Sequence, residues 1–438
     1  MNKNIGIIND AYQQKLIECF ELAQNQINTS FNKIDSYLDL FLNNNSDSLN
    51  IKKTEKKPFV PILDLPQIKF ENSNFVQQLC LAIQPLIQLN PNNQIKLKDL
   101  SLNEPQTNQE IQSLTNKSNG KTYTYQLIQQ YSISYNDWCG AIAINKDCSI
   151  LLAGCNKQIK VFEFKQDMIK QTQILSEHKD LVYTLNFMKK SYQFISGSCD
   201  KSIIIWQQNE NNQWVPQYIL NGHCNIIYCL LLNNNEDLIV SGSEDNTIKF
   251  WMKKSEWQCQ QTIKDHSGSV FGLSFNQQQN RVVSCSRDKL IFIMEQQFQN
   301  KEWVVIQKIV VEQYGYRLCF IDNNMFTFSQ HDKLQISIYE MNSGSQQFTK
   351  TRDIHIKCRQ GDDCLFPQLY INSKCILVSK YGQYVNLISK QLNGEFATEQ
   401  SIHFNTNSLF GNMSDDGEYL ITWDNNSKQI QIRRYQEQ

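Results

Sequence analysis

Apolar and polar residues follow a pattern that occurs three times between Gln173 and Met294. Its clearest copy runs from Tyr218 to Trp251 and reads YILNGHCNIIYCLLLNNNEDLIVSGSEDNTIKFW. A histidine precedes an apolar run, and a polar turn then leads to Ser-Gly-Ser, an aspartate and a tryptophan. Successive copies lie 45 and 43 residues apart. A fixed period of this length predicts a repeat protein.

The spacing inside the three copies is constant. The aspartate follows the histidine by 22 residues, and the last residue follows the aspartate by six. Because only the distance between copies varies, insertions are expected in the connecting loops. The three sets of positions are His178, Asp200 and Trp206; His223, Asp245 and Trp251; and His266, Asp288 and Met294.

Each period contains short runs with the composition of β-strands. The runs 238–240 and 248–251 are rich in β-branched and aromatic residues, and the segments 233–235 and 244–246 between them supply turn residues. One period therefore predicts about four short strands, which are too few to bury their own faces. Radial stacking of such units closes the arrangement and leaves few exposed edges.

Four weaker copies extend the array to seven. Their positions corresponding to the aspartate are Asn156, Asp332, Tyr381 and Asp424, within the segments Trp138–Phe162, Tyr316–Tyr339, Leu369–Lys390 and Phe404–Arg433. The last copy lacks a fourth strand, and the segment Tyr123–Gln130 has no unit of its own on its N-terminal side. We therefore predict an all-β ring of seven blades over residues 121–438, closed by that first strand.

The pattern resembles the WD40-repeat family of β-propellers, with Gly222-His223 as its Gly-His element and Trp251 as its tryptophan. In that family the histidine, the aspartate, a serine four residues before the aspartate and the tryptophan form a hydrogen-bonded structural set. Met294 cannot donate the indole hydrogen bond, so the third set is expected to be incomplete. The resemblance assigns the sets His178, Ser196, Asp200 and Trp206; His223, Ser241, Asp245 and Trp251; and His266, Ser284 and Asp288.

A lysine directly follows the aspartate position in four of the seven copies. The resemblance places this turn on the same rim as the histidine loop, where four lysines would form a positive surface for acidic peptides. The alternative is that they are ordinary surface lysines. These rim lysines are Lys157, Lys201, Lys289 and Lys333.

The first 120 residues differ in character from the repeats. Apolar residues between Leu16 and Phe41 fall at alternating steps of four and three, which indicates either a coiled coil or one amphipathic helix within residues 1–45. Residues 46–120 read as a polar linker with a short apolar helix near 74–89. The predicted organisation is thus a helical segment, a linker and a propeller.

Composition limits the classes of function. The formal net charge of −1 gives no general reason to expect nucleic acid or an anionic membrane as a partner. The N-terminal residues lack the pattern expected of a signal peptide, no run is long enough to span a bilayer, and the 14 cysteines include no Cys-x-x-Cys pair. We expect a cytoplasmic chain whose cysteines are small buried apolar residues. We interpret the abundant asparagine and glutamine as a compositional bias of the source that carries no functional information.

No catalytic, cofactor or metal motif stands out. Gly120-Lys121-Thr122 lacks the upstream glycine of a phosphate-binding loop, and His355-x-x-Cys358 lies in what is better interpreted as a polar surface loop. We expect a non-enzymatic platform that binds other proteins and needs no cofactor.

A weaker resemblance concerns one WD-repeat protein in particular. Tryptophans recur between the strong copies, at Trp214, Trp257 and Trp303, as in the WD-repeat subunit of the cytosolic iron–sulfur protein assembly machinery. This resemblance implies an alternative function, an adaptor that delivers iron–sulfur clusters to client proteins.

The N-terminal seam generates a prediction about association. About six apolar side chains per helix would each contribute about 1.5–3 kcal/mol when removed from water. Joining two chains costs about 4–15 kcal/mol, so we predict a weak dimer in the micromolar range. Light scattering across a concentration series tests this. A full chain that stays monomeric at tens of micromolar would contradict the coiled coil and favour the single helix.

Overall fold

In the computed structural model, residues 123–165, 168–357, 366–391 and 393–437 are described. They form 29 β-strands and one short 3-10 helix, η1 (Gln129–Tyr131). No helix in these ranges is long and apolar enough to cross a bilayer. The predicted helical segment 1–45 and linker 46–120 lie outside the described residues.

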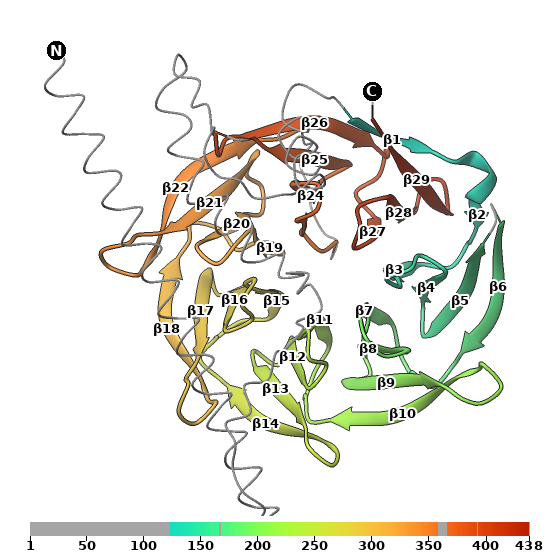
Figure 1. The fold of residues 1–438 in the computed structure, drawn as a ribbon, viewed down its shortest axis with the longest axis horizontal. Coiled ribbons are helices and arrows are strands. Elements are labelled where there is room, and N and C mark those ends of the chain that lie inside the picture. Colours follow the sequence, from blue (N-terminus) through green and yellow to red (C-terminus); the bar gives the residue numbers. More distant parts are fainter. Residues whose placement is uncertain (1–122, 166–167, 358–365, 392, 438) are drawn as a thin grey trace, which may run out of the picture. The chain divides into compact units, whose positions relative to one another are not determined.

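The strands form seven antiparallel sheets arranged as a closed ring, which confirms the predicted all-β, seven-bladed propeller (Figure 1). In blades 1–6 the strands are ordered as in the chain, and the first strand lies nearest the centre of the ring.

Blades 1–3 have the following strands: β3 (Cys139–Ile144), β4 (Ile150–Cys155), β5 (Gln158–Lys165) and β6 (Met168–Leu175); β7 (Val182–Phe187), β8 (Gln193–Ser198), β9 (Ser202–Gln208) and β10 (Trp214–Asn221); and β11 (Ile227–Leu232), β12 (Leu238–Ser243), β13 (Ile248–Lys253) and β14 (Trp257–Ile263).

Blades 4–6 have β15 (Val270–Phe275), β16 (Arg281–Ser286), β17 (Leu290–Gln296) and β18 (Trp303–Val310); β19 (Arg317–Phe320), β20 (Met325–Ser329), β21 (Gln335–Met341) and β22 (Phe348–His355); and β23 (Leu369–Ile371), β24 (Ile376–Tyr381), β25 (Tyr384–Lys390) and β26 (Phe396–His403). Blade 7 combines β27 (Leu409–Met413), β28 (Tyr419–Asp424) and β29 (Gln429–Glu437) with β1 (Tyr123–Leu127) and the short β2 (Ile133–Ser134).

Burial explains why the repeat has its apolar pattern. The middle strand β12 is buried along its whole length, because neighbouring blades cover both of its faces. The outer strand β14 is exposed over its central residues and buried at both ends. The apolar runs of the sequence are therefore the inner strands, and the polar outer strands face solvent.

The glycine of Ser-Gly-Ser allows the next blade to pack closely. A Cβ on Gly197 would lie 2.9 Å from Cγ2 of Ile227 in the following blade, and one on Gly242 would lie 2.7 Å from Cγ1 of Val270. Both distances are shorter than ordinary van der Waals contact. The motif therefore sets how tightly two blades approach, because any side chain at this position would force them apart.

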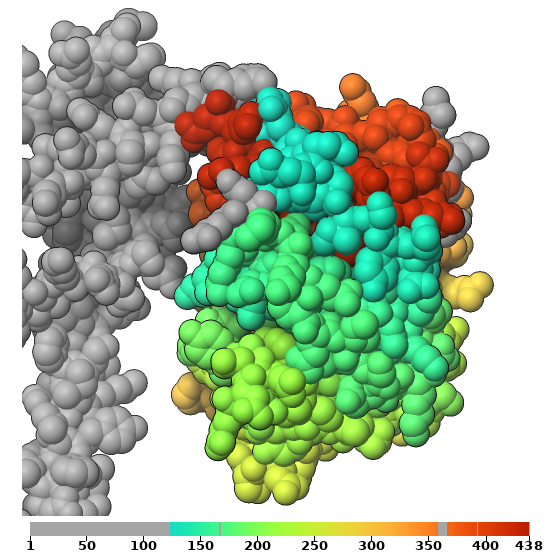
Figure 2. All heavy atoms as spheres, turned by 90° about the vertical axis from the view of Figure 1, so that its right-hand side faces the viewer, coloured from blue at the N-terminus to red at the C-terminus, as the bar shows by residue number. Residues whose placement is uncertain are grey.

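The ring closes through the first described strand. β1 pairs with β29 in antiparallel register, from Tyr123 opposite Glu437 to Leu127 opposite Arg433. Figure 2 shows the blue-green start of the described chain packed directly against its red C-terminal end. The expected strand Tyr123–Gln130 is shorter than predicted, because η1 follows it and turns the chain toward β2.

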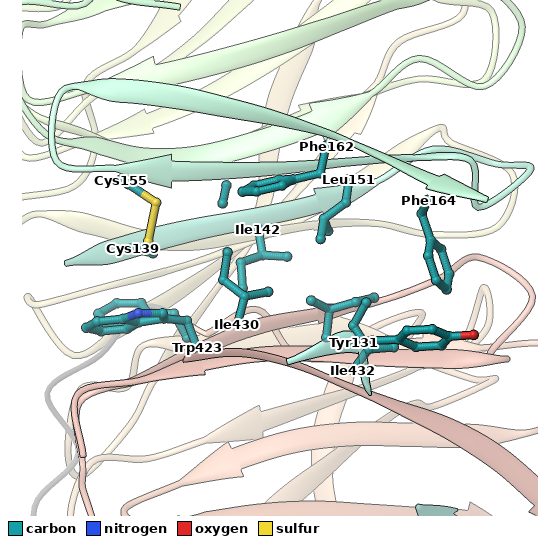
Figure 3. Packing of buried hydrophobic residues seen from close by; sticks show 13 residues of the cluster. Tyr131, Cys139, Ile142, Leu151, Cys155, Phe162, Phe164, Trp423, Ile430 and Ile432 are labelled. Atoms are coloured by element: carbon teal, nitrogen blue, oxygen red, sulfur yellow. A yellow bond between two sulfur atoms is a disulfide. The ribbon is translucent and has the colours of Figure 1, made fainter. Parts of the chain in front are cut away.

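A hydrophobic cluster fills the junction between blades 7 and 1 (Figure 3). Tyr131 from η1 packs edge-on against Phe164 of β5, with 5.2 Å between the ring centroids. Tyr125 in β1 is 2% exposed, and its Oη donates a 2.6 Å hydrogen bond to the carbonyl oxygen of Gly417. The closing segment is thus held by side-chain packing as well as by the strand ladder.

Glutamine side chains join the outer strands of neighbouring blades. Gln400 in β26 accepts a 2.7 Å hydrogen bond from the amide of Tyr125 and donates to its carbonyl oxygen over 3.3 Å. Gln173, Gln261 and Gln307 bond in the same way to both backbone groups of Trp214, Trp303 and Phe348. These four glutamines therefore have a structural role that their abundance in the sequence did not indicate. The bridge at Tyr125 also shows that β1 occupies the place of an outer strand.

The cysteines differ from expectation in two ways: Cys224, Cys259 and Cys375 are exposed, and one pair is bonded. Cys139 and Cys155 face each other across β3 and β4, with 4.0 Å between their Cα atoms, and form a disulfide. Both are buried, in the places that Val182 and Ser198 occupy in blade 2. Eight other described cysteines are free. The expectation of unpaired cysteines fails here because the ladder places the two side chains directly opposite each other.

The closure predicts a sharp boundary for truncation. A chain that starts at Tyr123 keeps β1 and should fold, whereas one that starts at Ile128 leaves the edge of β29 unpaired and should aggregate. Gel filtration and thermal unfolding of both proteins test this. Equal solubility and equal melting temperature would mean that β1 is dispensable.

Candidate functional site

Blades 2 and 3 bring the predicted His, Ser, Asp and Trp side chains into contact. In blade 2, His178 Nδ1 lies 2.8 Å from Asp200 Oδ2, and its Nε2 lies 2.7 Å from Ser196 Oγ. The indole of Trp206 donates to the same Ser196 oxygen over 2.8 Å. Blade 3 repeats these contacts at 2.8, 2.6 and 2.9 Å with His223, Asp245, Ser241 and Trp251.

Two further groups complete each set. The hydroxyls of Ser202 and Thr247, two residues after the aspartates, donate to Oδ1 of Asp200 and Asp245 over 2.6 Å. The backbone amide that follows each histidine donates to Oδ2 of the same aspartate, over 2.9 Å in blade 2 and 2.8 Å in blade 3. The sequence analysis missed the two hydroxyls, although a Ser or Thr at a fixed distance after the aspartate was a usable signal.

These donors determine the charge of the aspartates. Burial alone would raise the pKa of Asp245, but the hydrogen bonds from His223, Thr247 and the Cys224 amide hold it well below the ordinary value of 3.8. Asp200 has a lowered pKa for the same reasons. A folded pKa below the unfolded one means that the stabilisation is complete above pH 3.8 and is lost as the pH falls through the folded pKa.

Blade 4 has an incomplete set. His266 keeps its 2.8 Å contact with Asp288 and its 2.9 Å contact with Ser284, but Met294 stands in the place of the tryptophan. Leu290 stands in the place of the hydroxyl residue and offers Asp288 only its backbone amide, over 2.9 Å. Phe292 stacks on the His266 ring with 3.7 Å between centroids. An apolar contact thus covers the histidine where the indole hydrogen bond is missing.

The weaker blades use the aspartate positions differently. Asp332 contacts its neighbour His331, with 3.0 Å between Oδ2 and Nδ1. Asp424 ends β28 opposite Leu409 and accepts from the amides of Asn426 and Ser427, so it stabilises its own turn and has no histidine partner there. The predicted equivalence of Asp424 with the earlier aspartates is therefore wrong, because the turn of blade 7 begins at that residue.

The geometry of Ser196, His178 and Asp200 matches that of a serine-hydrolase triad, but its surroundings differ. Ser196 is fully buried, and its oxygen lies between the His178 ring and the Trp206 indole. A substrate carbonyl could not approach that oxygen without displacing both groups. The same arrangement also recurs in the next blade. These side chains therefore have a structural role. They hold the loop before the first strand of the blade, which carries the histidine, against the turn between the second and third strands, which carries the aspartate.

The rim lysines are not all equivalent. Lys157, Lys201 and Lys289 are exposed, whereas Lys333 is half-buried and its Nζ lies 2.9 Å from Oε2 of Glu312. Lys201 and Lys289 occupy the same place in their turns, because each amide bonds to the carbonyl of the serine three residues earlier. Lys157 lies in a shorter turn, with Cys155 paired directly to Gln158.

A row of aromatic side chains follows the first strands on the histidine rim. Its rings are Phe410, Trp138, Tyr183, Tyr228, Phe271 and Tyr316, from blades 7, 1, 2, 3, 4 and 5, with successive centroids 5.0, 5.4, 5.6, 5.4 and 4.8 Å apart. All except the buried Phe410 are partly exposed. We call these six residues the aromatic row.

The sequence analysis missed the aromatic row, although the sequence carries a signal for it. An aromatic residue follows the histidine by five residues in each strong copy, at Tyr183, Tyr228 and Phe271. Blade 1 supplies its ring from Trp138, which lies over Gly140; a Cβ there would be 2.2 Å from the indole. A partly exposed aromatic residue at a constant position points to a surface that several blades share.

The described ranges contain no candidate metal site. No group of three or more His, Cys, Asp or Glu side chains there could hold a metal ion. Cys358, which the sequence analysis considered beside His355, lies outside those ranges.

The sets generate a prediction about stability. Replacing Asp245 by alanine leaves the donors of the buried His223 and the partly buried Thr247 without this acceptor and should cost about 1–3 kcal/mol. The same change at Asp288 should cost less, because blade 4 provides no hydroxyl donor. Chemical denaturation of both variants tests this. Equal losses, or a larger loss for Asp288→Ala, would contradict the assigned roles.

Comparison with known proteins agrees with the architecture. The family model "WD domain, G-beta repeat" matches residues 169–207, 214–252 and 257–293. Human "Transducin beta-like protein 3" is 26% identical over 168 residues, which is 37% of this chain and 20% of that protein. "Elongator complex protein 2" of Saccharomyces cerevisiae is 31% identical over 153 residues, which is 34% of this chain and 18% of that protein.

A third relative, "p21-activated protein kinase-interacting protein 1-like" of Xenopus laevis, is 30% identical over 145 residues, or 32% of this chain and 38% of that protein. The matched part thus spans about a fifth of the first of these relatives. This chain therefore contains three WD40 repeats within a closed β-propeller of seven blades.

Proposed function

We propose that this chain is a non-enzymatic platform that binds other proteins through the histidine rim of its propeller. The observation that carries this is the partly exposed aromatic row, which crosses six consecutive blades beside loops fixed by the buried sets. Rigid loops that present exposed aromatic residues lose little entropy on binding, and such residues dominate the energy of many interfaces.

The relatives support a role in assemblies. Their names describe one as a protein of a complex and another as interacting with a kinase. Propellers of this family typically act in this way. We expect partners of this chain to be proteins and expect it to act in the cytoplasm, with self-association limited to the weak dimer predicted above.

The rim lysines offer a second contact for a partner. Lys201 and Lys289 are exposed at equivalent places and would attract acidic residues of a bound segment. Lys333 is already paired with Glu312 and would contribute less. The hypothesis that rim lysines attract an acidic segment therefore depends on Lys201 and Lys289, because Lys157 lies in a different turn.

The alternative, an adaptor for iron–sulfur cluster assembly, rests on tryptophans that have a packing role here. Trp214, Trp257 and Trp303 begin the outer strands of their blades and are 3%, 8% and 3% exposed. Packing in the hydrophobic core explains why a buried tryptophan recurs at this repeat position. They give a partner no surface to recognise, so the general platform is the better proposal.

Purification of the tagged full chain, followed by mass spectrometry, tests the platform. We expect a reproducible set of bound proteins that Lys201→Glu with Lys289→Glu reduces severalfold. The control is Lys254→Glu, an exposed lysine in the β13–β14 turn on the opposite rim. Absence of any specific partner would contradict the platform, and a set dominated by iron–sulfur assembly subunits would favour the adaptor.

A further inference from the structure

Two tyrosines of the aromatic row lie beside two carboxylates at the boundary of blades 2 and 3. Tyr183 and Tyr228 contact each other edge-on, with 5.6 Å between centroids and 80° between ring planes. Asp180 lies in the loop before β7, and Glu244 lies in the turn after β12. We call these four residues the blade 2–3 site.

The carboxylates act electrostatically on the neighbouring groups. Burial and then the carboxylate of Glu244 raise the pKa of Tyr228 to about 12. Burial, followed by the carboxylates of Asp180 and Glu244, raises the pKa of Cys199 to about 11. The carboxylate of Glu244 therefore lies near both Tyr228 and Cys199, and that of Asp180 lies near Cys199.

Neither carboxylate is paired with a cation of the described chain. Neither Asp180 nor Glu244 forms an ion pair with a described lysine or arginine, although Lys179 and Lys201 are exposed on the same rim. Rings elsewhere in the propeller do carry a cation, such as Tyr435 with Lys374 Nζ 3.6 Å from its centroid. In the described part of the chain, no lysine or arginine lies over Tyr228 in this way.

From this juxtaposition we propose that the blade 2–3 site binds an arginine side chain presented by a partner protein, with Trp138 and Phe271 as the flanking apolar contacts. The inference rests on the proposed function and names the chemistry of the partner. A guanidinium stacks on tyrosine faces and donates paired hydrogen bonds to carboxylates, so one side chain uses both features of the site.

Arginine suits the site better than lysine for two reasons. Its planar group is more weakly hydrated than an ammonium, so it loses less when the surrounding rings remove it from water. It also has five donors, enough to reach two carboxylates on different elements, whereas an ammonium acts as a compact point charge. The rings supply apolar area around the charge, which strengthens the pairing with Asp180 and Glu244.

Fluorescence anisotropy with defined peptides tests the proposal on the full chain. The probe is a fluorescein-labelled peptide of repeated Gly-Ser-Arg, compared with Gly-Ser-Lys and with Gly-Ser-citrulline, which has the shape of arginine without its charge. We expect the arginine peptide to bind tightest and the citrulline peptide about tenfold more weakly, with affinity falling as salt is raised.

Variants locate the binding. Glu244→Gln and Tyr228→Ala should each weaken the arginine peptide about tenfold. The matched controls, Glu210→Gln and Tyr192→Ala, change exposed residues in turns on the opposite rim and should leave binding unchanged. Glu244→Gln keeps shape and size, so it serves as the test even if Tyr228→Ala destabilises the fold.

Equal binding of arginine and citrulline peptides, no binding of either, or an unchanged affinity in Glu244→Gln would overturn the arginine site. The platform is tested separately by the proteins that co-purify with the chain. If wild type and Glu244→Gln retain the same partners, the platform stands and the arginine site is wrong. If wild type retains no partner, the platform itself fails, whatever the peptides show.

Discussion

Pairing between β1 and β29 is the constraint on which the rest of the structure depends. Every other blade takes its four strands from one continuous stretch, but blade 7 needs a strand from the far end of the described chain. Without it, the ring would expose a row of unpaired amides and carbonyls and lose the packing around Tyr125. Gln400 bonds to Tyr125 in the same way as other glutamines bond to outer strands, so β1 takes the place of an outer strand. Closure therefore makes the seventh junction equivalent to the others.

A closed ring also tolerates large differences in sequence between its blades. Blades 2 and 3 hold their rim loops with complete His–Ser–Asp–Trp sets. Blade 4 has Met294 in place of the tryptophan and stacks Phe292 on its histidine, and Asp424 of blade 7 orders its own turn. In blades 3 and 4 even the cross-strand pair of a cysteine and a glycine is inverted, with Cys229 opposite Gly242 and Gly272 opposite Cys285. A ring held by many junctions tolerates such exchanges, because each keeps the local volume.

The rim separates residues that support the structure from residues that can contact a partner. A list of catalytic residue types would select the histidines and aspartates of the sets first. The histidines are buried, the aspartates are partly buried, and both are satisfied by hydrogen bonds. The exposed chemistry lies beside them, in the aromatic row and in carboxylates such as Glu244. Titratable side chains thus fix the loops, while aromatic side chains provide the accessible area, which is the usual division in protein interfaces.

The sequence by itself determined the number of blades, the strand order and the sets around Asp200 and Asp245, because fixed spacing repeats wherever the same local contacts repeat. It did not determine the end of β1 at Leu127, the turn occupied by Asp424, the disulfide of Cys139 and Cys155, or the glutamine bridges. Only the tertiary structure decided these features. Three of the glutamine bridges join residues 41 or 42 positions apart, close to the repeat period, but which side chains face each other is fixed only when the strands pair and the ring closes. The aromatic row lies between the two cases: its five-residue offset was visible in three copies, but only the ring brought the side chains into contact across blades.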